Sequence, residues 1–233
     1  AVAIAVVANG EIKSLRVWGV KQIGSKEKAT PDSIFRLASV SKTLASTAAA
    51  ILVNQGKIRW DTPVLSLLPG VKFKNNQYGQ LLTLKHILSQ STGLPKHAAS
   101  SSIEADSSYS EAVKRLRNSR FLCAPGRCYA YQNVTFSLAG EMMEKKSGET
   151  FEQFVKHYLF DPLGMKNASY GLSGYLSTAN RTAPHIRRRK SWQMADVTEN
   201  YYRIAPAAGA NASIADMSQF LLAQLGKRQD ILP

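Results

Sequence analysis

The residues of this sequence that are best placed for chemistry are one serine and one lysine, three positions apart. In the stretch RLASVSKTLAST (residues 36–47), Ser39 and Lys42 stand in a run that is rich in alanine. At this spacing both side chains lie on one face of a helix. A serine hydroxyl is a weak nucleophile, and a lysine with a lowered pKa can be the base that activates it. The pair therefore predicts nucleophilic catalysis by Ser39, with Lys42 as the activating group.

The same Ser-x-x-Lys spacing occurs a second time, so spacing alone does not identify the site. Ser25 and Lys28 lie in a charged, turn-rich segment in which we expect both side chains to be solvated. A solvated lysine keeps its ordinary pKa and cannot activate a serine. Lys42 lies inside an apolar helix, where loss of hydration is expected to lower its pKa. The alternative is that Ser39 caps this helix and the Lys42 ammonium reaches solvent.

A second pair of polar residues, Tyr131 and Asn133, lies further along the chain in the stretch CYAYQNVTF. The phenol of Tyr131 can move a proton when it lies beside a lysine cation. The amide of Asn133 offers both a donor and an acceptor, which suits a substrate that contains an amide bond. The structural alternative is that Tyr131 packs in the core and that Asn133 caps the following helix. The residues by themselves leave both interpretations open.

Other catalytic patterns are missing from the sequence. It contains no Gly-x-Ser-x-Gly nucleophile elbow and no glycine-rich phosphate loop. The four histidines are scattered, and no pair has the spacing of metal ligands, so we expect neither a metal ion nor another cofactor. His86 and His157 fall within helical segments, and we expect them to be structural.

One hairpin and several helices are expected to position the site. The apolar opening AVAIAVVA ends at Asn9-Gly10, a strong turn signal, so residues 2–19 predict a β-hairpin. A helix is predicted from residue 39 to about 55, ended by Gly56. Four further helices are predicted, with Thr83 and Ser213 as caps of the first and the last: residues 84–90, 133–148, 151–164 and 213–226.

The composition is that of a basic globular protein. Of 233 residues, 44% are apolar, which is enough for a core in one or two domains. Thirty lysines and arginines against sixteen acidic residues give a net charge of +14, which favours anionic partners such as an envelope surface. No nucleic-acid-binding motif accompanies the charge, so we expect no nucleic-acid partner. The densest basic run, HIRRRK (185–190), is expected to be a solvated loop rather than a binding site.

Together these segments resemble the penicillin-recognising serine hydrolases of the class C β-lactamase type. The group contains class C β-lactamases, D-alanyl-D-alanine carboxypeptidases among the penicillin-binding proteins, and family VIII esterases. The resemblance covers nearly the whole chain. The segments that carry it are IFRLASVSKTLAST, GKIRWDTPVLSLLP, LTLKHILSQSTGLP, APGRCYAYQNVTFSLAGEMMEKKSGETFEQFVKHYLFDPLGM and GANASIADMSQFLLAQLG.

The resemblance implies a role for each candidate residue. Ser39 is the acylated nucleophile whose backbone N–H forms half of the oxyanion hole, Lys42 activates it, Tyr131 moves the proton, and Asn133 holds the substrate amide. The implied reaction is hydrolysis through an acyl-enzyme, with a β-lactam as the first substrate, a D-alanyl-D-alanine peptide as the second and an ester as the third. A non-catalytic protein that binds penicillin or envelope peptides is the alternative from another class. Class C β-lactamases commonly carry a tyrosine where this sequence has Ala208, so one wall of the β-lactam pocket differs.

The implied fold is α/β (α+β): an antiparallel sheet flanked by helices adjoins a mainly helical subdomain, and the active site lies between them. We expect residues 1–60 and 205–233 to form the sheet domain and residues 61–204 the helical subdomain. The family's first helix is expected before Ala1. Further strands and the third motif, Lys or His followed by Ser or Thr and Gly, are expected beyond the last residue. The chain alone is therefore expected to hydrolyse little. The sequence KSG at 146–148 is expected to end a helix instead of supplying that motif.

The two cysteines bear on the cellular location. Cys123 and Cys128 flank Pro125-Gly126, which suits a turn, so the two sulfur atoms can meet; free thiols in a cytosolic protein are the alternative. Members of the family act mostly in the periplasm or outside the cell, which favours the disulfide and a periplasmic or secreted location. The apolar opening is too short to span a bilayer, so we expect no transmembrane segment. The expected partner is a small-molecule or peptidoglycan-peptide substrate.

Overall fold

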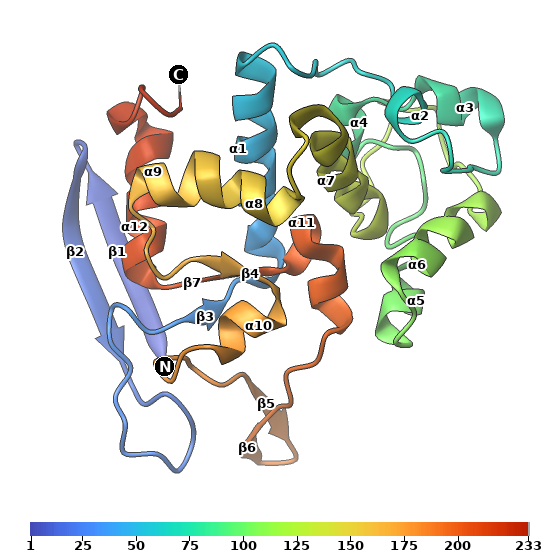
Figure 1. Ribbon diagram of the computed structural model, residues 1–233. Helices are drawn as coiled ribbons and strands as arrows, with labels where there is room; N and C mark the ends of the chain where they lie inside the picture. The colour runs from blue at the N-terminus through green and yellow to red at the C-terminus, as the bar shows by residue number, and fades with distance from the viewer. Residues whose placement is uncertain (233) are drawn as a thin grey trace.

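The computed structural model describes residues 1–232, in which helices lie around a small central sheet, one hairpin lies at an edge of the molecule and a second hairpin projects from it (Figure 1). Pro233, the end of the expected sheet-domain segment, lies outside the described residues. The strands are β1 (Val2–Ala8), β2 (Glu11–Trp18), β3 (Phe35–Arg36), β4 (Ser169–Tyr170), β5 (His185–Arg188), β6 (Ser191–Met194) and β7 (Ala210–Ala212). The helices are α1 (Ser41–Asn54), α2 (Val64–Leu67), α3 (Asn76–Leu81), α4 (Leu84–Leu88), α5 (Ser100–Glu104), α6 (Tyr109–Arg115), α7 (Val134–Ser147), α8 (Phe151–Val155), α9 (Asp161–Leu163), α10 (Gly171–Leu176), α11 (Ala205–Ala208) and α12 (Ile214–Leu222). Short turns of 3₁₀ or π helix adjoin them: η1 (Ala38–Val40), η2 (Leu116–Asn118), η3 (Lys156–Phe160), η4 (Asn200–Ile204) and η5 (Ala223–Lys227).

The predicted N-terminal hairpin is confirmed by the antiparallel pairing of β1 with β2. Asn9 and Gly10 connect the strands with φ angles of 53° and 74°, a conformation that this dipeptide adopts readily. Helix α12 packs against the hairpin and lies beside β1 at the left of Figure 1. Alternate residues of β1 therefore face α12, and the others remain exposed: Val2, Ile4 and Val6.

A small central sheet joins three distant parts of the chain. Its strand order is β3-β7-β4, with both pairs antiparallel. Just beyond β3, the backbone N–H of Leu37 donates to the carbonyl of Ala210, 2.9 Å away. This sheet therefore fixes the start of α1 beside the segment that contains α11 and β7.

Helix α1 is the centre of the core. Its buried positions are mostly small or aliphatic: Leu44, Ala45, Ala48, Ala49 and Leu52. It contacts α7, α8 and α11, which lie around it in Figure 1. Because alanine side chains are short, the neighbouring helices approach the α1 backbone closely, and this brings distant polar groups near the first turn of α1.

The local helix signals are confirmed. The side chains of Thr83 and Ser213 accept from backbone N–H groups at the starts of α4 and α12. Gly148 ends α7 in the left-handed conformation, with φ of 81°, so the KSG sequence is a helix terminus. The helix predicted at 151–164 consists of α8, η3 and α9 in direct succession.

Residues 186–190 are exposed, as expected for a solvated segment, but the expectation that the whole run is a loop is wrong. Residues 185–188 form β5, which pairs with β6 in the register His185↔Met194 to Arg188↔Ser191. A run of cations has no alternation of polar and apolar residues that would predict a strand. Residues 185–188 are recognisable as a strand only from their pairing with Ser191–Met194. Within the described part of the chain, none of the helices is long and apolar enough to cross a membrane.

Ser41, which is buried and lies between Ser39 and Lys42 in the sequence, links α1 to β7 by hydrogen bonds. The Ser41 hydroxyl donates to the carbonyl of Ala38 at 2.6 Å and accepts from the backbone N–H of Ala210 at 2.9 Å. The side chain is fully buried. We predict that Ser41→Ala lowers the free energy of unfolding by about 1–3 kcal/mol, because a buried N–H loses its acceptor. Urea unfolding measures this change.

Thr43→Ala is the matched control. The exposed hydroxyl of Thr43 donates to the carbonyl of Val40, and solvent replaces this bond when it is lost. The control is expected to change the free energy of unfolding by no more than about 0.5 kcal/mol. Equal effects of the two substitutions would contradict the proposed tie between α1 and β7.

Candidate active site

Ser39 lies in η1, directly before α1, and its side chain is exposed. The preceding residue, Ala38, has a φ of 45°, a left-handed conformation that is uncommon for a residue other than glycine. The Ser39 hydroxyl caps neither η1 nor α1. The capping alternative is therefore not what the structure contains, and the hydroxyl is available at the protein surface.

Lys42 is buried one turn further along the chain, with 9% of its surface exposed. Its ammonium group donates to Asn133 Oδ1 at 2.8 Å and to the carbonyl of Ala207 at 3.0 Å. The Lys42 Nζ atom lies 3.4 Å from Ser39 Oγ and 4.6 Å from the centre of the Tyr131 ring. No carboxylate forms an ion pair with Lys42 among residues 1–232. The side chain thus points into the protein instead of reaching solvent.

This burial lowers the pKa of Lys42 from 10.5 to about 8. The cause is loss of hydration, which disfavours the charged form of the amine. The direction agrees with the expectation from the apolar sequence around Lys42. A lysine with such a pKa loses its proton far more readily than a solvated one, which is the property that a base needs.

Tyr131 reaches Ser39 from a different segment of the chain. Its hydroxyl donates to Ser39 Oγ over 2.6 Å. Its backbone carbonyl accepts from the N–H of His97 at 2.8 Å, and the imidazole ring of His97 lies edge-on to the phenol ring at 5.4 Å. Two groups that can exchange protons, Lys42 Nζ and Tyr131 Oη, therefore converge on one serine oxygen.

Asn133 occupies the position before α7 but does not cap it with its side chain. Instead, its Oδ1 accepts from the buried Lys42 ammonium. Within the part of the chain that the structure describes, the Nδ2 group of Asn133 donates to no protein acceptor. This group is free to donate a hydrogen bond to a ligand.

The second Ser-x-x-Lys pair has none of these features. Lys28 is exposed, and its ammonium forms no hydrogen bond to Ser25 within residues 1–232. The Ser25 hydroxyl accepts instead from the backbone N–H of Glu27 at 3.0 Å. The two pairs share only their spacing.

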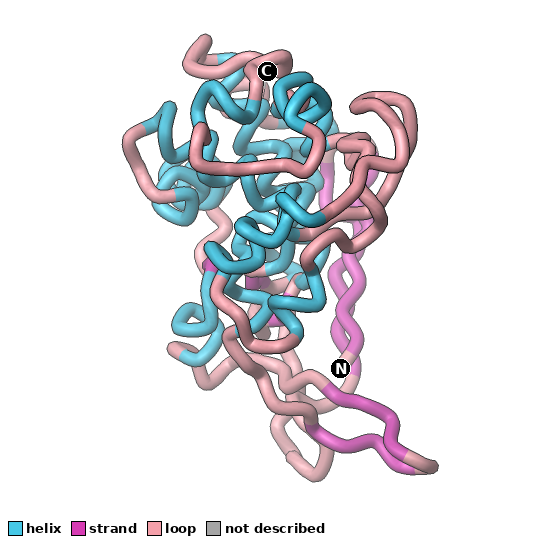
Figure 2. Tube along the Cα trace, turned by 90° about the vertical axis from the view of Figure 1, so that its right-hand side faces the viewer, coloured by secondary structure: helices cyan, strands magenta, loops and turns pink. Residues whose placement is uncertain are grey.

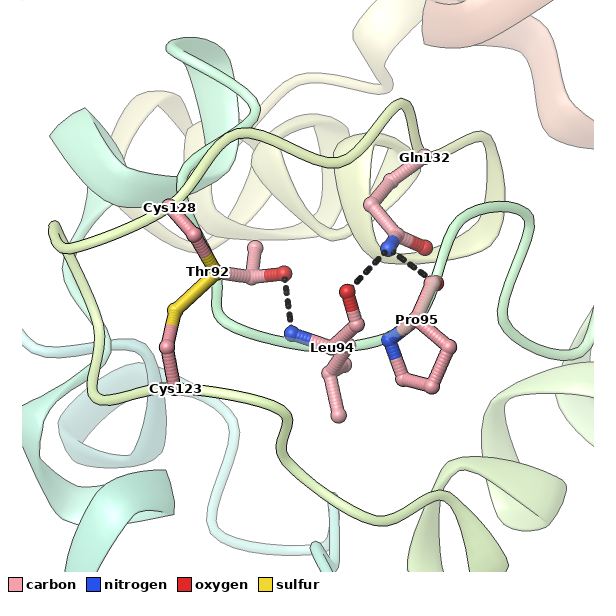
Figure 3. Close-up of a disulfide and its surroundings, with 6 residues drawn as sticks. All are labelled: Thr92, Leu94, Pro95, Cys123, Cys128 and Gln132. Atoms are coloured by element: carbon pink, nitrogen blue, oxygen red, sulfur yellow. Dashed lines mark hydrogen bonds between the residues drawn. A yellow bond between two sulfur atoms is a disulfide. The ribbon is translucent and has the colours of Figure 1, made fainter.

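Two glutamines that the sequence did not single out hold the Tyr131–Asn133 segment in place. Gln90 pairs with the backbone of Gln132 in both directions: its Oε1 accepts at 2.7 Å and its Nε2 donates at 3.2 Å. The Gln132 side chain donates to the carbonyls of Leu94 and Pro95, as Figure 3 shows. Both glutamines are buried. Neither has a spacing or composition signal, because their partners are backbone groups of distant residues.

A disulfide lies at the start of the same segment (Figure 3). Cys123 and Cys128 are joined, with their Cα atoms 6.3 Å apart. The loop docks on residues 91–93, since the N–H of Gly126 donates to Ser91 and that of Leu122 donates to Gly93. A Cβ atom at Gly93 would lie 2.3 Å from the carbonyl oxygen of Cys123, so this position requires glycine. The loop that leads to Tyr131 is therefore fixed at both of its ends.

The chain belongs to the β-lactamase family, because the family model described as Beta-lactamase matches residues 1–232. Penicillin-binding protein 4 of Amycolatopsis lactamdurans is 26% identical over 163 residues, which are 70% of this chain and 42% of that protein. The D-alanyl-D-alanine-carboxypeptidase/endopeptidase AmpH of Escherichia coli (strain K12) is 26% identical over 169 residues, which are 71% of this chain and 44% of that protein. The chain thus spans less than half the length of these curated relatives. The match places it in the serine hydrolase superfamily.

The fold has a close counterpart among solved structures. The octameric penicillin-binding protein homologue from Pyrococcus abyssi superposes with a TM-score of 0.85 at 21% sequence identity. The match covers 99% of this chain and 53% of that one. The predicted fold class, a mixture of helices and antiparallel sheet of the β-lactamase type, is confirmed.

Because the pKa of Lys42 is lowered, this residue makes stability depend on pH. The folded protein releases the Lys42 proton near pH 8, whereas the unfolded chain retains it up to 10.5. Between these values the unfolded state binds more protons, so the free energy of unfolding rises with pH. We predict that wild type gains about 3 kcal/mol relative to Lys42→Met across this window. Urea unfolding of both proteins at several pH values measures the difference, and a constant difference would contradict it.

The disulfide yields a second prediction. Cys123→Ser combined with Cys128→Ser is expected to lower the free energy of unfolding by about 2 kcal/mol, because the unfolded chain is no longer cross-linked. A reductant should bring wild type to the stability of the double variant and leave the variant unchanged. Alkylation of the non-reduced protein, followed by mass spectrometry, reports the thiols directly. Two alkylated cysteines in protein taken from its native compartment would show that the bond does not form there.

Proposed function

We propose that this protein is a serine hydrolase that works through an acyl-enzyme on Ser39. The observation that supports the proposal most strongly is the convergence of Lys42 Nζ at 3.4 Å and Tyr131 Oη at 2.6 Å on an exposed Ser39 Oγ. An activated nucleophile with two proton-exchanging neighbours suits acyl transfer. A protein that only binds its ligand has no need of a lysine with a lowered pKa beside a serine.

In the proposed acylation step, Ser39 Oγ attacks the carbonyl carbon of an amide, and its proton passes to the neutral amine of Lys42. The carbon–nitrogen bond then breaks, and the leaving nitrogen takes the proton of Tyr131. The Lys42 ammonium restores the proton on the Tyr131 oxygen. In deacylation, water attacks the ester, the bond to Ser39 Oγ breaks, and a proton from the water returns to Ser39.

Two groups are proposed to bind the substrate during this reaction. The free Nδ2 group of Asn133 donates to a carbonyl of the substrate, while Oδ1 of the same side chain stays bound to Lys42. The backbone N–H of Ser39 is proposed as one donor to the oxyanion that forms in the transition state. Asn133 thereby couples the position of the substrate to that of the base.

Hydrolysis of a β-lactam is the first substrate proposal, because the Asn133 amide suits an amide substrate. Cleavage of a D-alanyl-D-alanine peptide is the second, and the name of the Escherichia coli relative supports it. Ala208 is small and buried, and class C β-lactamases commonly carry a tyrosine at this position, so one wall of the proposed β-lactam pocket differs from theirs. We further propose that the protein acts in the periplasm or outside the cell, where the Cys123–Cys128 disulfide is stable.

Mass spectrometry after exposure to a penicillin tests the proposal. We predict that wild type gains the mass of one penicillin on the peptide containing Ser39, and that Ser39→Ala gains none. Lys42→Arg is expected to acylate at least about 100-fold more slowly, because arginine does not release its proton at neutral pH. The rate of acylation by wild type should rise with pH up to about 8, as Lys42 becomes neutral. Fast release of the adduct indicates a β-lactamase, and a long-lived adduct indicates a D-alanyl-D-alanine carboxypeptidase.

The chain supplies its own control in the second Ser-x-x-Lys pair. Ser25→Ala and Lys28→Arg make the same chemical changes at a solvated site and should leave acylation at the wild-type rate. Acylation of Ser39→Ala at a rate comparable to wild type would show that Ser39 is not the nucleophile. If neither this chain nor a longer form of the protein forms an adduct with a penicillin or hydrolyses a short-chain ester, the alternative of a non-catalytic binding protein is supported.

A further inference from the structure

The β5–β6 hairpin projects from the body of the protein, at the lower right of Figure 2. It forms a two-stranded sheet of its own, separate from the β3-β7-β4 sheet. Every residue from 186 to 194 is exposed, whereas the neighbouring His185 is partly covered and accepts a hydrogen bond from the N–H of Ile23 at 3.0 Å. The hairpin is therefore anchored at its base and free along its length.

Four consecutive cations form the end of this hairpin: Arg187, Arg188, Arg189 and Lys190. None of them forms an ion pair with a carboxylate in the described part of the chain. The connection itself is unusual in composition, because Arg189 has a φ of 53°, equal to that of Asn9 in the β1–β2 hairpin. Asparagine and glycine suit this conformation, and arginine does not. The sequence thus has an arginine at position 189, where the geometry of the turn favours asparagine or glycine.

Large apolar side chains accompany the cations. Trp192 is 57% exposed, Met194 is 56% exposed and Ile186 is 39% exposed. In the strand register, Arg187 lies directly opposite Trp192, so the two side chains share one face of the hairpin. Exposed tryptophan and methionine beside unpaired cations are uncommon on a surface that contacts only water.

We propose that the β5–β6 hairpin binds the surface of a lipid bilayer that contains anionic phospholipids. Clustered arginine and lysine side chains are attracted to anionic headgroups, and tryptophan is favoured at the boundary between headgroups and acyl chains. A soluble polyanion would engage the four cations but would leave Trp192 and Met194, which lie on the same face of the hairpin as Arg187, in water. The combination of both kinds of side chain on one projecting hairpin favours a bilayer, and this surface does not involve Ser39 or Lys42.

Co-sedimentation with vesicles tests the proposal. The protein should bind vesicles of phosphatidylglycerol mixed with phosphatidylcholine, and should bind much more weakly to phosphatidylcholine alone or at high salt. Replacing all four cations at 187–190 by glutamine should reduce the partition coefficient on the order of 100-fold or more. The matched control replaces four other exposed lysines by glutamine, which removes the same charge. Two lie between α2 and α3 and two lie in α7: Lys72, Lys74, Lys145 and Lys146. This control should bind nearly as well as wild type, and equal losses in the two variants would overturn the proposal.

Trp192 distinguishes a bilayer from a soluble polyanion. Trp192→Gln keeps the charge, so it should weaken binding to the anionic vesicles and leave binding to soluble polyglutamate unchanged. The tryptophan emission of wild type should shift to shorter wavelength with vesicles, and this shift should be lost in Trp192→Gln although Trp18 and Trp60 remain. Unchanged vesicle binding by Trp192→Gln, or no vesicle binding by wild type, would overturn the proposal. Circular dichroism and the thermal midpoint should be those of wild type for every variant, since all substituted residues are exposed.

Discussion

The Lys42 ammonium is buried and has no carboxylate partner within residues 1–232, and this is the constraint on which the rest of the site depends. A buried carboxylate would stabilise the charged form and raise the pKa of the lysine, and the amine would then fail as a base. Two neutral oxygens, Asn133 Oδ1 and the Ala207 carbonyl, take the place of water instead. They come from the start of α7 and from α11. The alanine-rich surface of α1 follows from this arrangement, because only short side chains let both helices approach the lysine.

Two residues of the site that are three positions apart, Ser39 and Lys42, differ sharply in their exposure to solvent. Ser39, the proposed nucleophile, is exposed, whereas Lys42, the proposed base, is buried. The abrupt change from η1 to α1, after the left-handed Ala38, produces this separation. Tyr131 completes the site from a segment without helix or strand. That segment relies on the paired side chain of Gln90, on Gln132 and on the nearby disulfide to hold its position.

The buried lysine has an energetic consequence for the whole protein. Keeping the charged form of Lys42 in the folded state at neutral pH opposes folding, because burial removes hydration from the ammonium group. The apolar contacts of α1 with α7, α8 and α11 must offset this term. A buried lysine of this kind therefore requires a well-packed helical core around it, and substitutions in that core are expected to lower the population of the folded protein.

The sequence by itself determined the elements whose causes are local. Asn9-Gly10 specified the first hairpin, and Thr83, Ser213 and Gly148 specified helix ends, because each acts on backbone groups within a few residues. The apolar context of Lys42 also indicated its lowered pKa. Other features depend on contacts between residues far apart in the chain, and only the tertiary structure decided them. Three features are of this kind. The Ala207 carbonyl accepts a hydrogen bond from Lys42, the side chain of Gln90 bonds to the backbone of Gln132, and residues 185–188 form a strand. Each of these contacts has a backbone group as at least one partner, and every residue possesses such groups, so no sequence pattern distinguishes them.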